Sequence, residues 1–277
     1  MKSRKTTIIL LISFFIGLSV LLYPSISSYW NSKTQSEAIV NYEAMLAQIK
    51  PEDYSALFQA ADTYNQKRYE LDDPYKDRGQ LPNYHSILDI TGTGMMGYIT
   101  IPRIGQELPV YHGTSDGVLS VAAGHLEGSS LPVGGKSTHS VVSAHRGLPT
   151  AVLFTHLDRM TIGDTFHFTI LDRTITYEVD QIRVVEPDDT GLIQIIDGKD
   201  YCTLLTCTPY GINTQRLLVR GHQVDASQTH SLYVANDAYR IEPLVVMPIV
   251  ALPIIAILLL YVIFAPVKKR SPEEENL

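Results

Sequence analysis

The sequence predicts a mainly β domain, either a barrel or a sandwich, with N-terminal helices and flanking transmembrane segments. Three observations lead to this prediction. From Gly97 onward, short β-prone runs alternate with Gly, Pro and Asp residues, which is the spacing of all-β barrels and sandwiches. Upstream of them, apolar residues recur at helical intervals. Near each end of the 277-residue chain lies an uncharged apolar run of about the length that crosses a bilayer.

The N-terminal run, from Thr6 to Tyr23, follows three basic residues. This arrangement is typical of a signal peptide or of a retained membrane anchor. Ser25-Ile26-Ser27 is only a weak small-x-small cleavage site, so the sequence favours the anchor. We assign residues 1–30 to this N-terminal signal or anchor.

Residues 32–70 predict two helices, because their apolar residues fall at spacings of three and four. Pro51 separates the helices and suits the first turn of the second one, which we expect to end near Tyr69. The apolar stripes are Ile39, Tyr42, Met45, Leu46 and Ile49 in the first helix and Leu57, Phe58, Ala61 and Tyr64 in the second. A charged, turn-rich loop follows at residues 72–79.

Six β-prone runs bounded by turn residues predict strands. They are Gly97–Ile101, Thr138–Ala144, Thr165–Ile170, Ile175–Val185, Tyr201–Cys207 and Arg216–Val224. Thr150–Arg159 predicts a short helix between two of them. Residues 226–242 are polar and predict a juxtamembrane linker.

The C-terminal apolar run, Leu244–Phe264, has 21 residues without a charge. Its two prolines argue against a soluble helix but are tolerated in membrane helices. The basic cluster at 268–270 places the following end in the cytoplasm. We therefore expect a transmembrane helix at 243–265 and a cytoplasmic tail at 266–277. Residues 31–242 are then on the outer face of the cell membrane.

The chain carries a net charge of −7, and the segment between the two apolar runs carries about −10. This acidic balance argues against a nucleic-acid role, because phosphate binding needs a basic surface. Solubility explains the charge more simply than the attraction of basic partners does. Neither a histidine pair with metal-ligand spacing nor an acidic calcium loop is present in the sequence. We expect no metal and no cofactor.

The two cysteines, Cys202 and Cys207, fall in one predicted strand. Five residues of strand put their Cα atoms roughly 16 Å apart and their side chains on opposite faces. A disulfide between them is excluded, since bridged Cα atoms lie within about 7 Å of each other. A free thiol in an exported protein without disulfides suggests a catalytic role at a Gram-positive-type surface.

Three residues at the ends of predicted strands carry the groups needed for acyl transfer through a thioester. Cys207 supplies the thiol before a Pro-Tyr-Gly-Ile-Asn turn, and His145 follows another β-prone run. Arg216 lies across the turn from the cysteine, where a guanidinium can stabilise an oxyanion. Plainer interpretations exist: a small buried hydrophobe for the cysteine and a surface ion pair for the arginine. His139 would share a strand face with His145, so the pattern alone does not separate the two histidines.

These residues resemble the sortases, and specifically their pilin-polymerising class C branch. The Thr-Leu-x-Thr-Cys signature is matched by residues 203–207, and the order of His145, Cys207 and Arg216 matches as well. The Asp-Pro-aromatic lid motif of class C is matched by Asp73, Pro74 and Tyr75. Gln215 stands where many relatives carry a histidine. The two-anchor arrangement and the N-terminal helices also resemble class C.

The resemblance implies an eight-stranded sortase barrel at residues 81–225, after an extracellular helical region with a lid loop at 31–80. It implies that Cys207 attacks the threonine carbonyl of an LPxTG-like pilin sorting signal, with His145 as proton donor and Arg216 at the oxyanion. A lysine amine of the next pilin then resolves the thioester. In the lid, Asp73 is expected to pair with Arg216 and the Tyr75 ring to cover Cys207, while Pro74 fixes the loop between them.

Other functions remain open at this point. A peptidoglycan L,D-transpeptidase or a cell-wall cysteine peptidase is a rival, but the Ser/Thr-His-Gly-Cys run of the former is absent. A housekeeping sortase that attaches surface proteins to the cell wall is closer. A non-catalytic pilus scaffold would make Cys207 dispensable.

Overall fold

The computed structural model describes residues 4–225 except 82, together with residues 251, 253, 255 and 257. The chain divides into two compact units, and the boundary falls within the first helix, between Ser27 and Ser28. That helix, α1 (Arg4–Leu46), contains Pro24 and carries a stretch, Leu11–Leu46, long and apolar enough to cross a membrane. The two predicted N-terminal elements are therefore one continuous helix.

Helix α2 (Pro51–Tyr69) begins at the predicted proline and ends at the predicted tyrosine. Of its expected apolar stripe, Phe58, Ala61 and Tyr64 are buried in the main core. The C-terminal part of α1 contributes Ile39 and Tyr42, which form a smaller buried cluster with Met95. The helical periodicity thus identified the sides of both helices that pack on the β domain.

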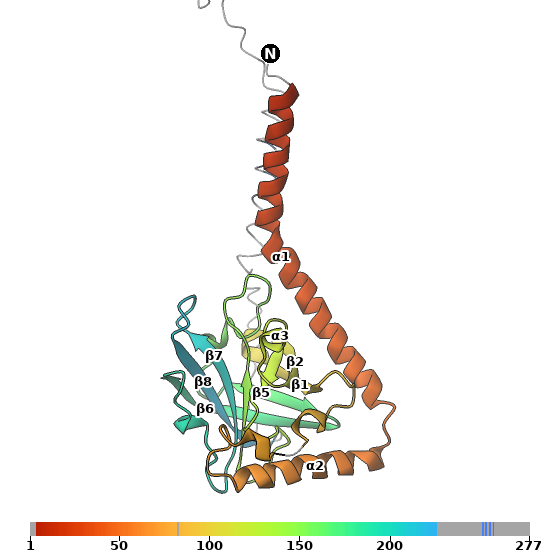
Figure 1. The fold of residues 1–277 in the computed structure, drawn as a ribbon, viewed down its shortest axis with the longest axis vertical. Coiled ribbons are helices and arrows are strands. Elements are labelled where there is room, and N and C mark those ends of the chain that lie inside the picture. Colours follow the sequence, from red (N-terminus) through yellow and green to blue (C-terminus); the bar gives the residue numbers. More distant parts are fainter. Residues whose placement is uncertain are drawn as a thin grey trace, which may run out of the picture. The chain divides into compact units, whose positions relative to one another are not determined.

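The β domain is a closed barrel of eight strands in the order β1-β2-β3-β4-β7-β8-β6-β5, seen in Figure 1. The strands are β1 (Met95–Ile101), β2 (Gln106–His112), β3 (Ala123–His125), β4 (Thr138–Ser143), β5 (Thr165–Ile170), β6 (Arg173–Val185), β7 (Asp200–Thr208) and β8 (Gln215–Val224). The β2–β3 and β4–β7 pairs are parallel, and the other neighbours are antiparallel. The predicted barrel is confirmed.

All six predicted strands are present, but β2 and β3 were missed. Strand β2 contains Pro109 and two polar residues at its start, and β3 has only three residues with a central glycine, so neither shows the usual period-2 signal. The helix expected at Thr150–Arg159 was wrong, because only the 3-10 turn η4 (Leu157–Arg159) forms there. The remaining short helical elements are η1 (Arg78–Gln80), η2 (Tyr84–Ser86), η3 (Pro102–Ile104), α3 (Asp116–Leu119) and η5 (Gly191–Ile193).

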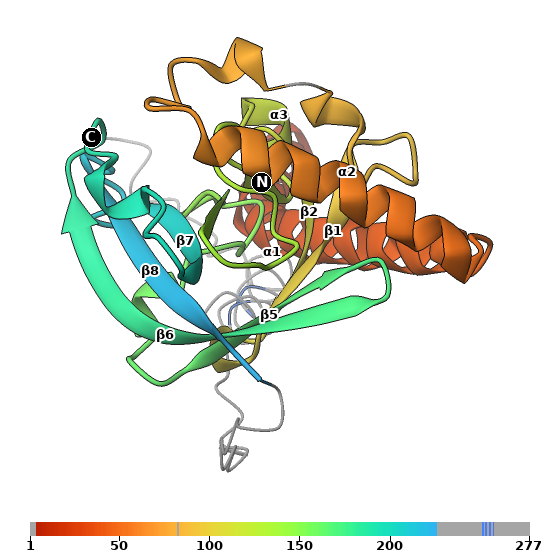
Figure 2. The ribbon, with the colours of Figure 1, turned by 90° about the horizontal axis from the view of Figure 1, so that it is seen from below.

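Barrel closure depends on the pairing of β1 with β5. A Cβ at Gly97 of β1 would collide with the carbonyl of Thr169 in β5, so glycine is the residue that permits this close approach. The interior is filled by apolar side chains from all sides, including Phe166, Phe168 and Leu204. Helix α2 lies along one side of the barrel in Figure 2.

The predicted linker at 226–242, the transmembrane helix at 243–265 and the tail at 266–277 lie outside the described residues, apart from four isolated helical positions.

Candidate active site

The barrel brings His145, Cys207 and Arg216 together at the ends of three neighbouring strands. Cys207 of β7 is paired with Arg216 of β8. In the parallel β4–β7 ladder, the pairing Ser143↔Leu205 is the last before the strand ends. Continuing that register by two residues places His145 level with Cys207. By this extension of the ladder, the three predicted residues fall in one row across the ends of β4, β7 and β8, with the cysteine in the middle.

Backbone contacts extend the ladder up to this row. The amide of Ala144 donates to the Leu205 carbonyl at 3.2 Å, and the Thr206 hydroxyl donates to the Ala144 carbonyl at 2.8 Å. On the other side of the row, the His145 carbonyl accepts from the Phe154 amide at 3.2 Å. The loop after β4 is thus tied to β7 immediately before His145 and to its own continuation immediately after, which fixes the backbone that carries the imidazole.

The two thiols have opposite environments, as the odd spacing predicted. Cys202 is fully buried in the main core, and burial raises the pKa of its thiol well above the usual value. Cys207 is half-buried, and both cysteines are free. Only the thiolate is a good nucleophile, so Cys207 is the thiol suited to chemistry.

The guanidinium of Arg216 is held by main-chain acceptors. Its Nη1 donates to the carbonyls of Asn213 and Gln215, at 3.2 and 3.0 Å. A guanidinium has five N–H donors, so this anchoring leaves others for an oxyanion. The expected ion pair between Asp73 and Arg216 was wrong: Asp73 pairs with Lys76 at 2.6 Å. The lysine lies only three residues away on the same turn, where it reaches the carboxylate at little entropic cost.

The predicted lid loop, residues 72–79, packs on the face that carries the row of His145, Cys207 and Arg216. Pro74 is buried, and its carbonyl lies so close to Gly128 that a Cβ there would be 2.7 Å away. Tyr75 joins a cluster formed by Val141, Ile193 and Leu218, to which Leu205 also belongs. By strand parity, Val141, Leu205 and Leu218 share a face with His145, Cys207 and Arg216. The tyrosine thus occupies the part of this face next to the row.

Arg68 of α2 packs against the predicted lid loop, a contact that the sequence did not reveal. The side chain is 3% exposed, and its Nε donates to the Gly128 carbonyl at 3.0 Å. Its guanidinium carbon lies 5.8 Å from the centre of the Tyr75 ring, within the range of a cation–π contact. The Tyr75 hydroxyl donates to the Ile193 carbonyl at 3.0 Å. The available signal was the spacing of Arg68 from Tyr64, which puts a cation on the buried side of α2.

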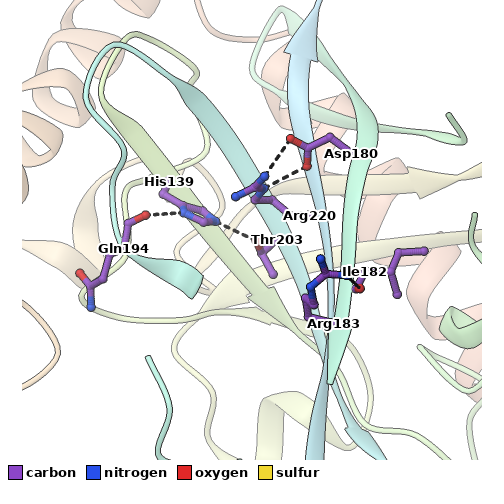
Figure 3. A network of polar contacts seen from close by, with 7 residues as sticks. All are labelled: His139, Asp180, Ile182, Arg183, Gln194, Thr203 and Arg220. Atoms are coloured by element: carbon purple, nitrogen blue, oxygen red, sulfur yellow. Dashed lines mark hydrogen bonds and ion pairs between the residues drawn. The ribbon is translucent and has the colours of Figure 1, made fainter. Parts of the chain in front are cut away.

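His139 shares the strand face of His145 but is a structural residue. Its ring lies between the Gln194 backbone and the Thr203 hydroxyl in Figure 3. A carbonyl can only accept, so Nδ1 donates to Gln194 at 2.8 Å and Nε2 accepts from Thr203 at 2.7 Å. Burial lowers the pKa of His139 to about 4. With both nitrogens bonded, it is not available as an acid or base, and this separates it from His145.

A thiol, an imidazole and a guanidinium in one row can carry out nucleophilic acyl transfer, with proton transfer on one side of the thiol and charge stabilisation on the other. The apolar face beside the row is covered by Tyr75.

Comparison with known proteins identifies the family. A sortase domain model matches residues 99–224. The chain is 49% identical to the crystal structure of sortase C1 from Streptococcus agalactiae, covering 68% of this chain and 98% of that one, with a TM-score of 0.63.

Two further structures are similar to a comparable extent. A Streptococcus pneumoniae sortase C, whose structure concerns catalysis and pilin substrate specificity, is 44% identical over 68% of this chain and 97% of its own, with a TM-score of 0.61. A Clostridium perfringens sortase C with the C-terminal cell wall sorting motif is 42% identical over 69% and 99%, with a TM-score of 0.60. The chain belongs to the sortase family of cysteine transpeptidases, in its pilin-polymerising class C branch.

Proposed function

We propose that this sortase joins pilin subunits by cleaving an LPxTG-like sorting signal and transferring the acyl group to a lysine of the next pilin. The row His145–Cys207–Arg216 carries the proposal. It places a nucleophile between a proton-transfer group and a charge-stabilising group, which is the order that acyl transfer needs. The similarity to sortases of pilin systems and to one with a sorting motif supports the choice of substrate.

In the first half of the reaction, the Cys207 thiolate attacks the threonine carbonyl of the signal. The carbonyl oxygen becomes an oxyanion, to which the N–H groups of Arg216 not used by the Asn213 and Gln215 carbonyls donate. Collapse of this intermediate breaks the threonine–glycine amide bond. The imidazolium of His145 gives its proton to the departing glycine amine. A thioester between the pilin and Cys207 remains.

In the second half, a lysine amine of another pilin attacks the thioester. A lysine with a pKa near 10.4 is mostly protonated at neutral pH, so its ammonium group first loses one proton to solvent. The neutral amine then attacks, and the second proton, which its nitrogen loses as the amide forms, is accepted by His145, left neutral by the first half. The thiolate leaves, an isopeptide bond joins the two pilins, and the imidazolium and thiolate are restored for the next cycle.

The lid loop gates this reaction in our proposal. Tyr75 covers the apolar face beside the catalytic row, where the sorting signal must lie for its threonine to reach Cys207, and Pro74 lies against Gly128. Arg68 and the Ile193 carbonyl stabilise the closed position. The enzyme would then cleave only when the loop leaves its site, as lids do elsewhere.

We further propose that the enzyme works on the outer face of the cell membrane, anchored at both ends. The apolar stretch of α1 supports the first anchor, and the uncharged run at 243–265 with its basic flank supports the second. Protease treatment of intact cells tests this: a tag at residue 230 should be cleaved and a tag after residue 277 should be protected.

The activity test uses the full-length chain in detergent with a quenched fluorescent LPxTG-like peptide and with a pilin that carries the signal. Tyr75→Ala serves as the opened form, Cys207→Ala as the inactive form and Cys202→Ala as the matched cysteine control. We expect peptide cleavage and hydroxylamine-resistant pilin ladders with the opened form and with its Cys202→Ala derivative, and neither product with Cys207→Ala.

Other outcomes would select another function. Cleavage without ladders would indicate a sortase that attaches proteins to the cell wall. Cleavage by the Cys207→Ala variant would contradict the thioester mechanism. A folded, opened enzyme that cleaves nothing would favour the scaffold interpretation.

A further inference from the structure

Arg146, the residue after His145, reaches the segment that follows Cys207. Its Nη1 donates to the Thr208 hydroxyl at 3.4 Å, and its Nη2 donates to Asp158 Oδ2 at 2.5 Å. Thr208 is the neighbour of Cys207 in β7, and Asp158 lies in η4. One side chain thus connects the His145 loop, the end of the cysteine strand and the turn that closes the loop.

The same side chain contacts the β7–β8 turn, residues 209–214. Its guanidinium carbon lies 5.7 Å from the centre of the Tyr210 ring, within cation–π range. The next residue, Gly147, leaves room for that ring: a Cβ there would lie 3.1 Å from Tyr210 Cε2, and its φ of +76° also favours glycine. Arg146 and Gly147 together form the surface on which Tyr210 rests.

The burial of Arg146 is not explained by stability alone. Its side chain is 7% exposed, yet its Nε is buried without a hydrogen-bond partner. A buried donor left unpaired costs free energy that an apolar side chain of similar size would not. Departures of this kind concentrate at functional sites, and this one lies beside the row that contains Cys207.

We propose that Arg146 is a positioning residue for the transfer reaction: it clasps the β7–β8 turn and the end of β7 to the His145 loop, and so fixes the imidazole against the Cys207 thiol. The inference rests on the proposed roles of His145 and Cys207. Arginine suits the task because its planar fork donates in two directions while its face meets an aromatic ring. A lysine has the charge but neither the fork nor the face.

The test uses the full-length chain with the opened lid, Tyr75→Ala, so that access to the site does not limit any rate. Arg146→Met and Arg146→Lys are compared with Arg173→Met, a control that loses an arginine stacked 3.7 Å from the Phe58 ring centre, outside the site. His145→Ala gives the level expected when the imidazole is missing. The measurements are thermal melting, the iodoacetamide labelling rate of Cys207 without substrate, and kcat and KM for the LPxTG-like peptide.

We expect Arg146→Met to lower kcat and the labelling rate towards the His145→Ala level, about 100-fold for a misplacement near 1 Å, while KM and the melting temperature stay near those of Arg173→Met. Arg146→Lys should not restore the activity. Tyr210→Phe should retain activity and Tyr210→Ala should lose part of it, because the ring, not its hydroxyl, meets the guanidinium.

Two results would overturn the inference while leaving the proposed function intact. A raised KM with unchanged kcat and labelling would make Arg146 a substrate-binding residue. A melting temperature that falls in step with every rate would make it a purely structural one. If His145→Ala itself changes neither labelling nor cleavage, the proposed roles fail first, and the positioning role of Arg146 fails with them.

Discussion

Cys207 of β7 and Arg216 of β8 are paired next to the turn that joins the two strands. The thiol and the guanidinium therefore lie on neighbouring strands beside that turn. Five residues earlier in β7, Cys202 is paired with Gly221 and its side chain enters the core. One strand thus presents one cysteine to the site and the other to the barrel interior, as the alternation of side chains requires.

This difference predicts selective labelling. Iodoacetamide at about pH 7.5 should add one group to the native chain, on Cys207, and a second only after unfolding, because burial hides Cys202 and raises the pKa of its thiol. Intact-mass and peptide mass spectrometry check the prediction. Cys202→Ala should keep the single native adduct while losing about 1–3 kcal/mol of stability to a small cavity. A native adduct on Cys202 would show that the barrel opens there.

The sequence predicted the barrel class, six of the strands and the position of His145, Cys207 and Arg216 at strand ends, because these depend on local signals. Regular strands can be recognised by their composition and their flanking turns. The three residues of the row stand at the ends of such strands, two of them on either side of a hairpin turn. Strand β3 could not be found in this way, since its three residues become a strand only through the partners on either side. The continuity of α1 through Pro24 was missed because proline usually marks a helix boundary.

The lid should open more often without its tyrosine ring. Tyr75→Ala removes a hydrogen bond to the Ile193 carbonyl and the packing on Val141 and Leu218. Each 1.4 kcal/mol lost from the closed state raises the open population about tenfold, so we expect Cys207 labelling at least about tenfold faster. Stopped-flow labelling of the native protein measures this rate.

A matched control separates the lid from a general loss of a tyrosine. Tyr69, on the last turn of α2, donates its hydroxyl to Asp197 at 3.3 Å and is exposed. Tyr69→Phe should therefore leave the labelling rate unchanged. Equal rates for Tyr75→Ala and the wild type would mean that the closed loop does not restrict access to Cys207.

Asp73, by contrast, should matter little to closure. Its carboxylate pairs with Lys76 on the same exposed turn, and that pairing lowers the pKa of Asp73. Exposed ion pairs contribute little to stability, so the labelling rate of Cys207 in Asp73→Asn should be within about twofold of the wild-type rate. A strong acceleration in this variant would show that the Asp73 carboxylate helps to keep the loop closed.

The contacts of the lid side chains could not be predicted from the sequence. The motif Asp73-Pro74-Tyr75 identified the loop, but not the partners of its side chains, which come from segments far away in sequence: Arg68 in α2 and Ile193 before β7. Long-range packing of this kind leaves no periodic signal. The same holds for Arg146, whose position next to His145 was visible while its contacts with Asp158 and Tyr210 were not.

The buried His139 predicts a pH dependence of stability. Its pKa is lowered to about 4 in the folded protein, against about 6.5 in an unfolded chain. Between these two pH values only the unfolded state binds the extra proton, so protonation favours unfolding. The contribution of neutral His139 to the stability of the folded state is fully present above pH 6.5 and is lost as the pH falls towards 4, about 3 kcal/mol in all.

Urea unfolding of the full-length chain at several pH values between 4.5 and 7.5 checks this prediction. Asp200 acts in the opposite direction: burial raises its pKa to about 6, so its contribution to stability is lost as the pH rises through that value. The comparison must therefore be with a variant rather than with the wild type alone. His139→Gln can still donate to the Gln194 carbonyl and accept from Thr203, but it does not titrate. The wild type should lose stability relative to His139→Gln as the pH falls from 6.5 to 4.5. Parallel plots of unfolding free energy against pH for the two proteins would mean that folding does not lower the pKa of His139.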